Sequence, residues 1–266
     1  MIDLQALILP IIIFAAVGIV AGLLLTVVSN AFAVKENEQV LSVTDALPGI
    51  NCGVCGFSGC EEYAKTIVGK HNAPNLCIPG GATAAMAISE IMGIPFEGVE
   101  SRSAFIHCEG NYDATSNKYD YKGAVSCETA NMYYKGRAFC EYGCIGFGDC
   151  AQVCEYGAIT ISNGLAVIDR EKCTGCLLCA KRCPKNLILS ERNNSAVVVA
   201  CMSRNSGKVT RQNCKRGCIA CKRCEKECPT GAVKVENNLA KINYDICHNC
   251  GKCAEVCPMS TIRVYN

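Results

Sequence analysis

Two short runs near the end of the chain decide its fold: "CIACKRCEKECP", from Cys218 to Pro229, and "CHNCGKCAEVCP", from Cys247 to Pro258. Each run spaces four cysteines as C-x2-C-x2-C-x3-C and then places a proline. The chain of 266 residues contains 24 cysteines in all. This abundance indicates a disulfide framework, zinc sites or iron–sulfur clusters.

The spacing within the two runs favours iron–sulfur clusters. It is the run of bacterial two-cluster ferredoxins, in which the fourth cysteine of each run binds the other cluster. Zinc sites usually combine pairs of C-x2-C, and cysteines this close within one run seldom reach disulfide geometry. The predicted ligands are Cys218, Cys221, Cys224 and Cys257 for one 4Fe–4S cluster, and Cys247, Cys250, Cys253 and Cys228 for a second.

These runs belong to the second copy of an internal repeat. Cys144 precedes Cys218 by 74 residues, and the same shift places "YGAITISNGLAVIDREKC" on "TGAVKVENNLAKINYDIC" without a gap. The repeat predicts two tandem bacterial-type ferredoxin modules of the α+β class, with short hairpin strands such as "AITIS" and "LAVID". In the first module it predicts a cluster on Cys173, Cys176, Cys179 and Cys154.

The first copy lacks one ligand, because Phe147 stands where the second copy has Cys221. Cys140 lies four residues before Cys144 and is a candidate replacement. We therefore expect another cluster on Cys140, Cys144, Cys150 and Cys183. Cys214 is the counterpart of Cys140, and we do not expect it to be a ligand, since Cys221 is present.

A further group of cysteines follows the apolar N-terminal segment: Cys52, Cys55, Cys60 and Cys77, spaced C-x2-C-x4-C-x16-C. Glycines between them let backbone N–H groups approach the sulfur atoms, which suits a fifth 4Fe–4S cluster, with a zinc site as the alternative. Four cysteines remain: Cys108, Cys127, Cys201 and Cys214. We expect them to be inert buried thiols, and a sixth cluster or redox-active disulfides are the alternatives.

No charged residue occurs from Leu4 to Val34, and about 20 apolar residues suffice to cross a bilayer as a helix. A signal peptide would have a basic start and a shorter apolar core, and a buried helix of this length would usually carry a polar face. We therefore expect an uncleaved single-pass anchor in the cell (inner) membrane. Clusters need a reducing compartment, so Lys35 onward should face the cytoplasm, with Met1 outside.

Three stretches carry a family resemblance: "LPGINCGVCGFSGCEEYA" from Leu47, "CIPGGATAAMAISEIMG" from Cys77 and "CEYGCIGFGDC" from Cys140. They resemble the B subunit of the Rnf electron-transport complexes in its longer, anaerobe-type form, and the resemblance covers nearly the whole chain. We expect a transmembrane anchor at 1–34, an N-terminal 4Fe–4S domain at 35–100, a connecting segment at 101–137, and ferredoxin modules at 138–192 and 198–266.

The resemblance implies an electron-transfer subunit of a membrane enzyme that oxidises reduced ferredoxin, reduces NAD and moves Na+ or H+ across the membrane. It also implies that the NAD, flavin and ion sites lie on other subunits. In agreement, the sequence has no strand–GxGxxG–helix unit, and the anchor has no ionisable residue. The alternatives are a cluster subunit of a membrane hydrogenase or of a redox-sensor-reducing system, and a redox sensor without turnover. A sensor needs one labile cluster, whereas a series of clusters suits a path for electrons.

A basic segment lies within the second module, although the net charge of the chain is only +2. Between Cys201 and Lys226 one acid, Glu225, stands against eight basic residues: Arg204, Lys208, Arg211, Lys215, Arg216, Lys222, Arg223 and Lys226. Soluble ferredoxins are usually acidic, so this segment predicts a ferredoxin docking face. A solvated face, or one held against anionic lipid headgroups, is the alternative.

Overall fold

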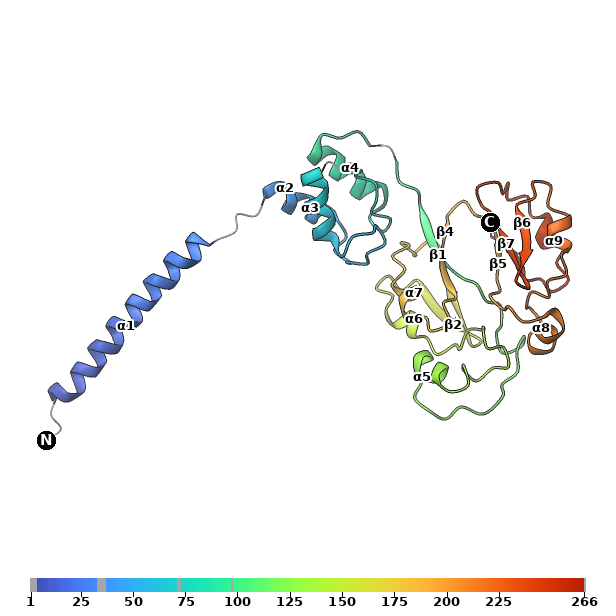
Figure 1. Ribbon diagram of the computed structural model, residues 1–266, viewed down its shortest axis with the longest axis horizontal. Coiled ribbons are helices and arrows are strands. Elements are labelled where there is room, and N and C mark those ends of the chain that lie inside the picture. The colour runs from blue at the N-terminus through green and yellow to red at the C-terminus, as the bar shows by residue number, and fades with distance from the viewer. Residues whose placement is uncertain (1–3, 33–36, 71–72, 97, 266) are drawn as a thin grey trace.

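The computed structural model describes residues 4–32, 37–70, 73–96 and 98–265. These residues form a long N-terminal helix that stands apart, a small helical domain and a larger α+β body (Figure 1). Lys35 and the expected boundary at residue 34 lie outside the described residues.

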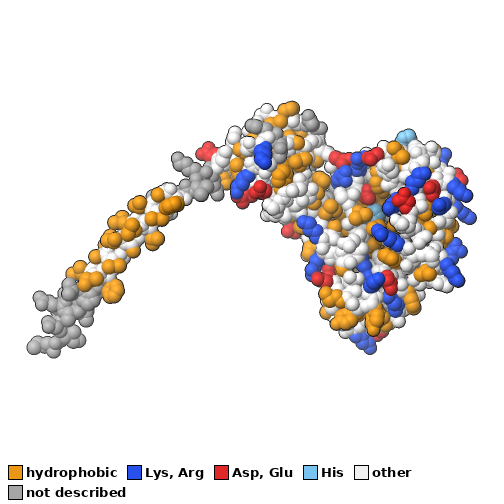
Figure 2. Space-filling view, in the orientation of Figure 1, with side chains coloured by type: hydrophobic (Ala, Val, Ile, Leu, Met, Phe, Trp, Pro, Cys, Tyr) orange, Lys and Arg blue, Asp and Glu red, His pale blue; other side chains and the backbone are white. Residues whose placement is uncertain are grey.

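The N-terminal helix α1, Leu4–Ala31, is the one helix within the described ranges that is long and apolar enough to cross a membrane. No part of its most apolar window, Ile12–Ser29, is buried against the rest of the protein. Figure 2 shows hydrophobic side chains along its exposed length. A helix that is apolar all round needs apolar surroundings, and a bilayer would supply them.

Three helices form the domain after α1: α2 (Glu38–Ala46), α3 (Cys60–Lys70) and α4 (Gly81–Met92). The Asn37 side chain caps α2 by accepting the backbone N–H of Gln39 at 3.0 Å. Gly93 ends α4 with a φ of 65°, the left-handed conformation common after helices. The buried core of the domain consists of Val43, Leu47, Tyr63, Ala64, Ile67, Cys77 and Ile88.

The first module of the α+β body comprises β1 (Arg102–Ile106), α5 (Cys127–Met132), α6 (Asp149–Gln152), β2 (Ile159–Ser162), β3 (Leu165–Ile168), α7 (Leu178–Arg182) and β4 (Ile188–Arg192). β1 pairs with β4 and β2 with β3, both antiparallel. Between β2 and β3 the chain turns at Asn163 and Gly164, whose φ values of 48° and 72° suit a two-residue hairpin.

The second module repeats this order with β5 (Val197–Val199), α8 (Gly207–Asn213), α9 (Arg223–Lys226), β6 (Val233–Glu236), β7 (Leu239–Ile242), α10 (Lys252–Glu255) and β8 (Ile262–Val264). β5 pairs with β8 and β6 with β7, again antiparallel. The hairpin strands expected from the repeat are therefore confirmed in both copies.

One expected boundary differs from the structure. β1 was expected to lie in the connecting segment 101–137, yet it pairs along its whole length with β4. The first module therefore begins at Arg102, and the rest of that segment is an excursion within the module. Aligning the two copies with a fixed shift of 74 residues does not match β1 to β5, because the excursion adds residues to the first copy only.

The two modules pack directly on each other. The Nδ1 atom of His107, just after β1, lies 2.9 Å from the carbonyl oxygen of Val199 in β5. A guanidinium nitrogen of Arg263 in β8 lies 2.5 Å from a carboxylate oxygen of Glu109. The ends of β1 and β5 are thereby brought side by side, and each strand leads into a cysteine two residues later.

Candidate metal centres

All 24 cysteines are free thiols. Within the described ranges, no three Cys, His, Asp or Glu side chains converge on a point where one metal ion could bind. The thiols are gathered in six groups of four.

Quartet I consists of Cys52, Cys55, Cys60 and Cys77 in the N-terminal domain, the grouping expected from their spacing. Asn51 shapes its loop by accepting the backbone N–H of Cys60 on Oδ1 at 2.8 Å. The backbone of Gly80 passes so close that a Cβ atom there would lie 3.1 Å from the sulfur of Cys77.

Quartet II consists of Cys154, Cys173, Cys176 and Cys179, again as the sequence predicts. Leu177, with a φ of 55°, turns the chain into α7 in the left-handed conformation. The backbone N–H of Ala104 in β1 donates to the sulfur of Cys173 at 3.3 Å. A strand from outside the repeated run therefore contributes to this site.

Quartet III differs from the expected group. Cys144, Cys150 and Cys183 line one space together with Cys127, and Cys140 is not among the residues around it. Cys127 is the first residue of α5, and the buried carboxylate of Asp149 holds it there. Asp149 accepts the backbone N–H of Cys127 at 2.8 Å and the hydroxyl of Ser126 at 2.9 Å.

Cys127 thus lies in the place where the first copy of the repeat lacks a cysteine. Phe147, which occupies the position of that ligand, packs beside Cys127 and Ile145. The excursion between β1 and Cys140 carries α5 to this place. The set expected from proximity in sequence has Cys140 in this place, whereas the structure puts Cys127 beside Cys144, Cys150 and Cys183.

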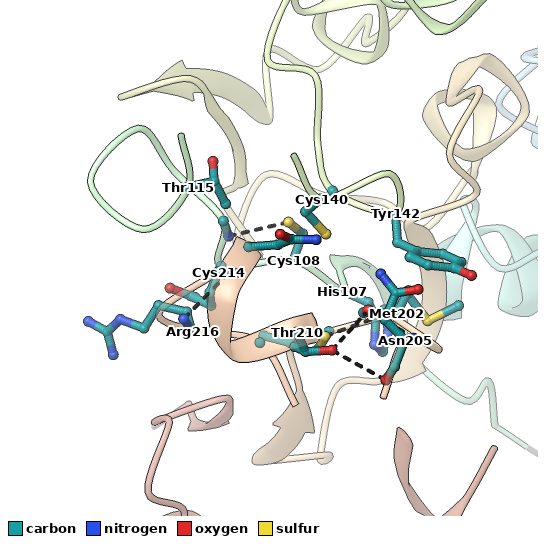
Figure 3. Close-up of a pocket in the computed structure, with 18 residues that line it drawn as sticks. His107, Cys108, Thr115, Cys140, Tyr142, Met202, Asn205, Thr210, Cys214 and Arg216 are labelled. Carbon is teal, nitrogen blue, oxygen red and sulfur yellow. Dashed lines mark hydrogen bonds between the residues drawn. The ribbon is translucent and has the colours of Figure 1, made fainter. Parts of the chain in front are cut away.

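Quartet IV consists of Cys108, Cys140, Cys201 and Cys214, which line a pocket between the two modules (Figure 3). Cys214, which is not expected to be a ligand, thus lies in the same pocket as Cys140. Quartet IV differs from the expected set of four remaining cysteines by one member, since it contains Cys140 in place of Cys127.

Quartet IV is built with approximate twofold symmetry. The sulfur of Cys108 accepts backbone N–H groups from Gly110 at 3.3 Å and Cys144 at 3.4 Å. The sulfur of Cys201 accepts the corresponding groups from Ser203 at 3.4 Å and Cys218 at 3.3 Å. Each module therefore supplies one thiol just beyond its first strand and one thiol, Cys140 or Cys214, just before its cysteine run.

The sequence contains a pattern that points to quartet IV, but aligning the two copies without a gap does not show it. "AFIHC" ends at Cys108 and "VVVAC" ends at Cys201, so each cysteine follows its strand at the same distance. The shift between these two cysteines is 93 residues, whereas it is 74 between Cys140 and Cys214. The excursion in the first copy accounts for the difference.

Quartets V and VI lie in the second module. Quartet V consists of Cys218, Cys221, Cys224 and Cys257, which line one space beneath Val199 and Ile262. Quartet VI consists of Cys228, Cys247, Cys250 and Cys253. Cys221 and Cys250 are the two exposed cysteines of the chain, so quartets V and VI reach the protein surface.

Burial raises the pKa of several of the buried thiols. It raises the pKa of Cys150 to about 12 and of Cys201 to about 11, and neighbouring thiols of their own and adjacent quartets add to both shifts. It raises the pKa of Cys108 still further, with Cys144 adding to the effect. Thiols of this kind are neutral and unreactive at pH 7 unless a metal replaces their protons.

The quartets follow one another in a row. Cys52 of quartet I and Cys176 of quartet II are close enough for their charges to interact, and so are Cys179 of quartet II and Cys150 of quartet III. Hydrogen bonds join quartet III to IV through Cys144 and Cys108, and quartet IV to V through Cys201 and Cys218. Quartets V and VI share one run, in which Cys224 lies in α9 and Cys228 follows two residues after the helix ends.

The basic segment of the second module lies on the outside of this row. Seven of its eight basic residues are exposed, and Arg216 is half-buried. None of the eight takes part in an ion pair in the part of the chain that the structure describes, and Glu225 pairs instead with Lys234 at 3.8 Å. Figure 2 shows Lys and Arg side chains along the outer edge of the body, where the second module lies.

Comparisons with known proteins agree with these centres. Residues 47–79 match a family model described as a putative Fe-S cluster, residues 166–189 a 4Fe-4S binding domain and residues 217–262 a 4Fe-4S dicluster domain. The three matches fall on quartets I, II and V–VI. Quartet IV, Cys154 of quartet II, and all of quartet III except Cys183 lie outside them.

Similarity to curated proteins extends over almost the whole chain. The B subunit of the Na(+)-translocating ferredoxin:NAD(+) oxidoreductase complex of Acetobacterium woodii is 39% identical over 97% of this chain and 78% of its own length. The B subunit of the proton-translocating ferredoxin:NAD(+) oxidoreductase complex of Clostridium ljungdahlii is 38% identical over 94% and 88%. The B subunit of the ion-translocating oxidoreductase complex of Methanosarcina acetivorans is 37% identical over 90% and 91%. The resemblance noted in the sequence is thereby confirmed, and the chain belongs to the family formed by the B subunits of ion-translocating oxidoreductase complexes.

Proposed function

We propose that this chain is the iron–sulfur electron-transfer subunit of an ion-translocating ferredoxin:NAD(+) oxidoreductase, and that it carries six 4Fe–4S clusters. The row of six thiol quartets is the observation that carries this proposal. A redox sensor would need one such site, whereas a row extends from the domain next to the apolar helix to the far module. The relatives' names supply the substrates, ferredoxin and NAD(+).

The donor sets fit the proposed clusters. Quartets III, IV and V each line a small apolar space, and backbone N–H groups already point at several of the sulfur atoms. When bound, a 4Fe–4S cluster gains or loses one electron with little movement of the protein. The chain's own part is to hold the thiols, to exclude water and to fix the separation between neighbouring quartets.

The proposed ligand assignment extends the expectation of five clusters to six. Quartets I, II, V and VI keep the predicted ligands, quartet III takes Cys127, and quartet IV becomes a site between the modules. Quartet IV supports the larger number because it is the link that joins the first module to the second. Without quartet IV, no thiol site would lie between quartet III and quartet V to carry electrons from one to the other.

Total iron is the direct test of this count. Iron and acid-labile sulfide, measured per chain after anoxic purification, should each approach about 24, at four atoms per quartet. About 20 of each would support five clusters and leave one quartet as plain thiols. A zinc content comparable to iron would overturn the proposal.

We also propose an orientation and a docking face. The described helix α1 would anchor the chain in the cell membrane, with the cluster domains in the cytoplasm. Reduced ferredoxin would then dock on the basic segment of the second module, where exposed Cys221 lies beside Lys222 and Arg223. Unpaired positive charge there would attract an acidic partner and speed its encounter roughly 10- to 1000-fold at low salt.

The docking face is tested by charge reversal. Changing Lys215, Arg216, Lys222 and Arg223 to Glu should lower the second-order rate of electron transfer from reduced ferredoxin and weaken its dependence on salt. Reversal of Lys118, Lys122 and Lys135, which lie in the excursion of the first module, is the matched control. An unchanged rate with intact iron content would place the entry point elsewhere.

A further inference from the structure

The N-terminal domain meets the first module through the loops that carry quartets I and II. The ammonium group of Lys181 in α7 donates to the carbonyl oxygen of Cys52 at 2.7 Å, in a partly buried position. The same nitrogen would lie 3.7 Å from a Cβ atom placed on Gly53. A charged hydrogen bond therefore reaches from the quartet II loop to the backbone of a quartet I residue.

A second contact lies on the other side of the same loop. Gly175 is buried, has a φ of 71°, and leaves no space for a side chain. A Cβ atom there would lie 2.4 Å from the carbonyl oxygen of Arg102 and 3.2 Å from Cγ2 of Ile78. Ile78 directly follows Cys77, so both loops of quartet I approach the quartet II loop closely.

Comparing the two copies of the repeat shows which residues of the quartet II loop serve the contact with the N-terminal domain. Under the 74-residue shift, Lys181 corresponds to Glu255 and Gly175 to Asn249. Those residues occur in the second module, which carries its cysteine run in the same way without an N-terminal domain against it. A cation and a glycine at these two positions are therefore requirements of the domain contact, and not of the loop itself.

We propose that Lys181 is a positioning residue that holds quartet I against quartet II, so that electrons can pass between the N-terminal domain and the modules. The inference rests on the proposed ligation of clusters by both quartets. The contact breaks no bond and moves no proton, and its role is to fix the gap across which single electrons travel. Because one charged hydrogen bond and close glycine packing hold it, the contact is sensitive to a single substitution.

The test compares three variants of the full chain. Lys181→Met removes the hydrogen bond, Lys181→Arg keeps a cationic donor, and Lys172→Met is the matched control. Lys172 directly precedes Cys173, carries the same charge near quartet II, and pairs with the half-buried Asp169 at 3.2 Å. Iron per chain, hydrogen exchange and magnetic interaction between reduced clusters are measured for each.

Lys181→Met should keep the iron content of the parent protein. Hydrogen exchange in residues 51–56 and 76–80 should rise about tenfold, which corresponds to about 1.4 kcal/mol, the size expected for a charged hydrogen bond that solvent partly screens. The spin–spin splitting between the clusters of quartets I and II should weaken in parallel. Lys181→Arg should restore both signals, and Lys172→Met should leave them unchanged.

Unchanged exchange and splitting in Lys181→Met, with full iron content, would overturn this inference and leave the proposed function standing. An equal change in Lys172→Met would also overturn it, because charge and not contact would then be responsible. A parent protein that lacks iron at quartet I or II would instead contradict the proposed function.

Discussion

Quartets III and IV predict how iron is lost when single cysteines are removed. Cys140 and Cys214 line the same pocket, so Cys140→Ala and Cys214→Ala should each remove the same cluster, about four of about 24 iron atoms. The double variant should lose no more than either single variant. Cys127 belongs to quartet III, so combining Cys127→Ala with Cys140→Ala should remove about eight iron atoms.

The assay is iron and acid-labile sulfide per chain, with electron paramagnetic resonance to detect three-iron products. A cube that loses one ligand can survive as a three-iron form, so the spectrum, and not only the iron count, identifies the affected site. Twice the loss in the Cys140→Ala, Cys214→Ala double variant would refute the shared pocket. So would an identical spectral change in Cys140→Ala and Cys144→Ala.

A rescue experiment makes the prediction sharper. Phe147 packs beside Cys127 and occupies the position that Cys221 has in the second module. Adding Phe147→Cys to Cys127→Ala should return a ligand to quartet III from the position used by the other copy, and should restore about four iron atoms. The same substitution added to Cys140→Ala should restore none, because Cys140 lines a different pocket.

Two further predictions concern stability. Asp149→Ala should lower the melting temperature and weaken iron binding at quartet III. The buried N–H of Cys127 and the hydroxyl of Ser126 would lose their acceptor, at a cost of about 1–3 kcal/mol in the free energy of unfolding. An unchanged melting temperature and iron content would contradict this prediction. Removal of iron by a chelator should abolish the near-ultraviolet circular dichroism of both modules, since cysteines make up about a third of their small buried cores. A natively folded iron-free protein would show that the cores suffice alone.

Local spacing was enough to predict much of the site. Quartets I, II, V and VI bring together the cysteines expected from their runs, because three ligands in each lie within one short loop. The hairpin strands were also predictable, since Asn163-Gly164 and its counterpart mark a two-residue turn between alternating apolar residues. These features depend on residues close together in the chain.

Quartets III and IV could not be assigned in this way, because their ligands are brought together by tertiary packing. Cys127 reaches its quartet on α5, whose position depends on the buried carboxylate of Asp149. Cys108 reaches quartet IV because β1 pairs with β4 and lies beside β5, a pairing across more than 80 residues of sequence. The missing ligand at Phe147 signalled that another thiol must be recruited, but not which one.

The symmetry of quartet IV has a consequence for dividing the molecule. Residues 193–196, between β4 and β5, are the natural place to cut if the repeat is taken as two domains. A cut there leaves Cys108 and Cys140 on one fragment and Cys201 and Cys214 on the other. Each fragment would expose half of a thiol site and lose the wall that shields it from water. The smallest autonomous unit of the body is therefore the pair of copies, and a one-copy fragment is an incomplete protein.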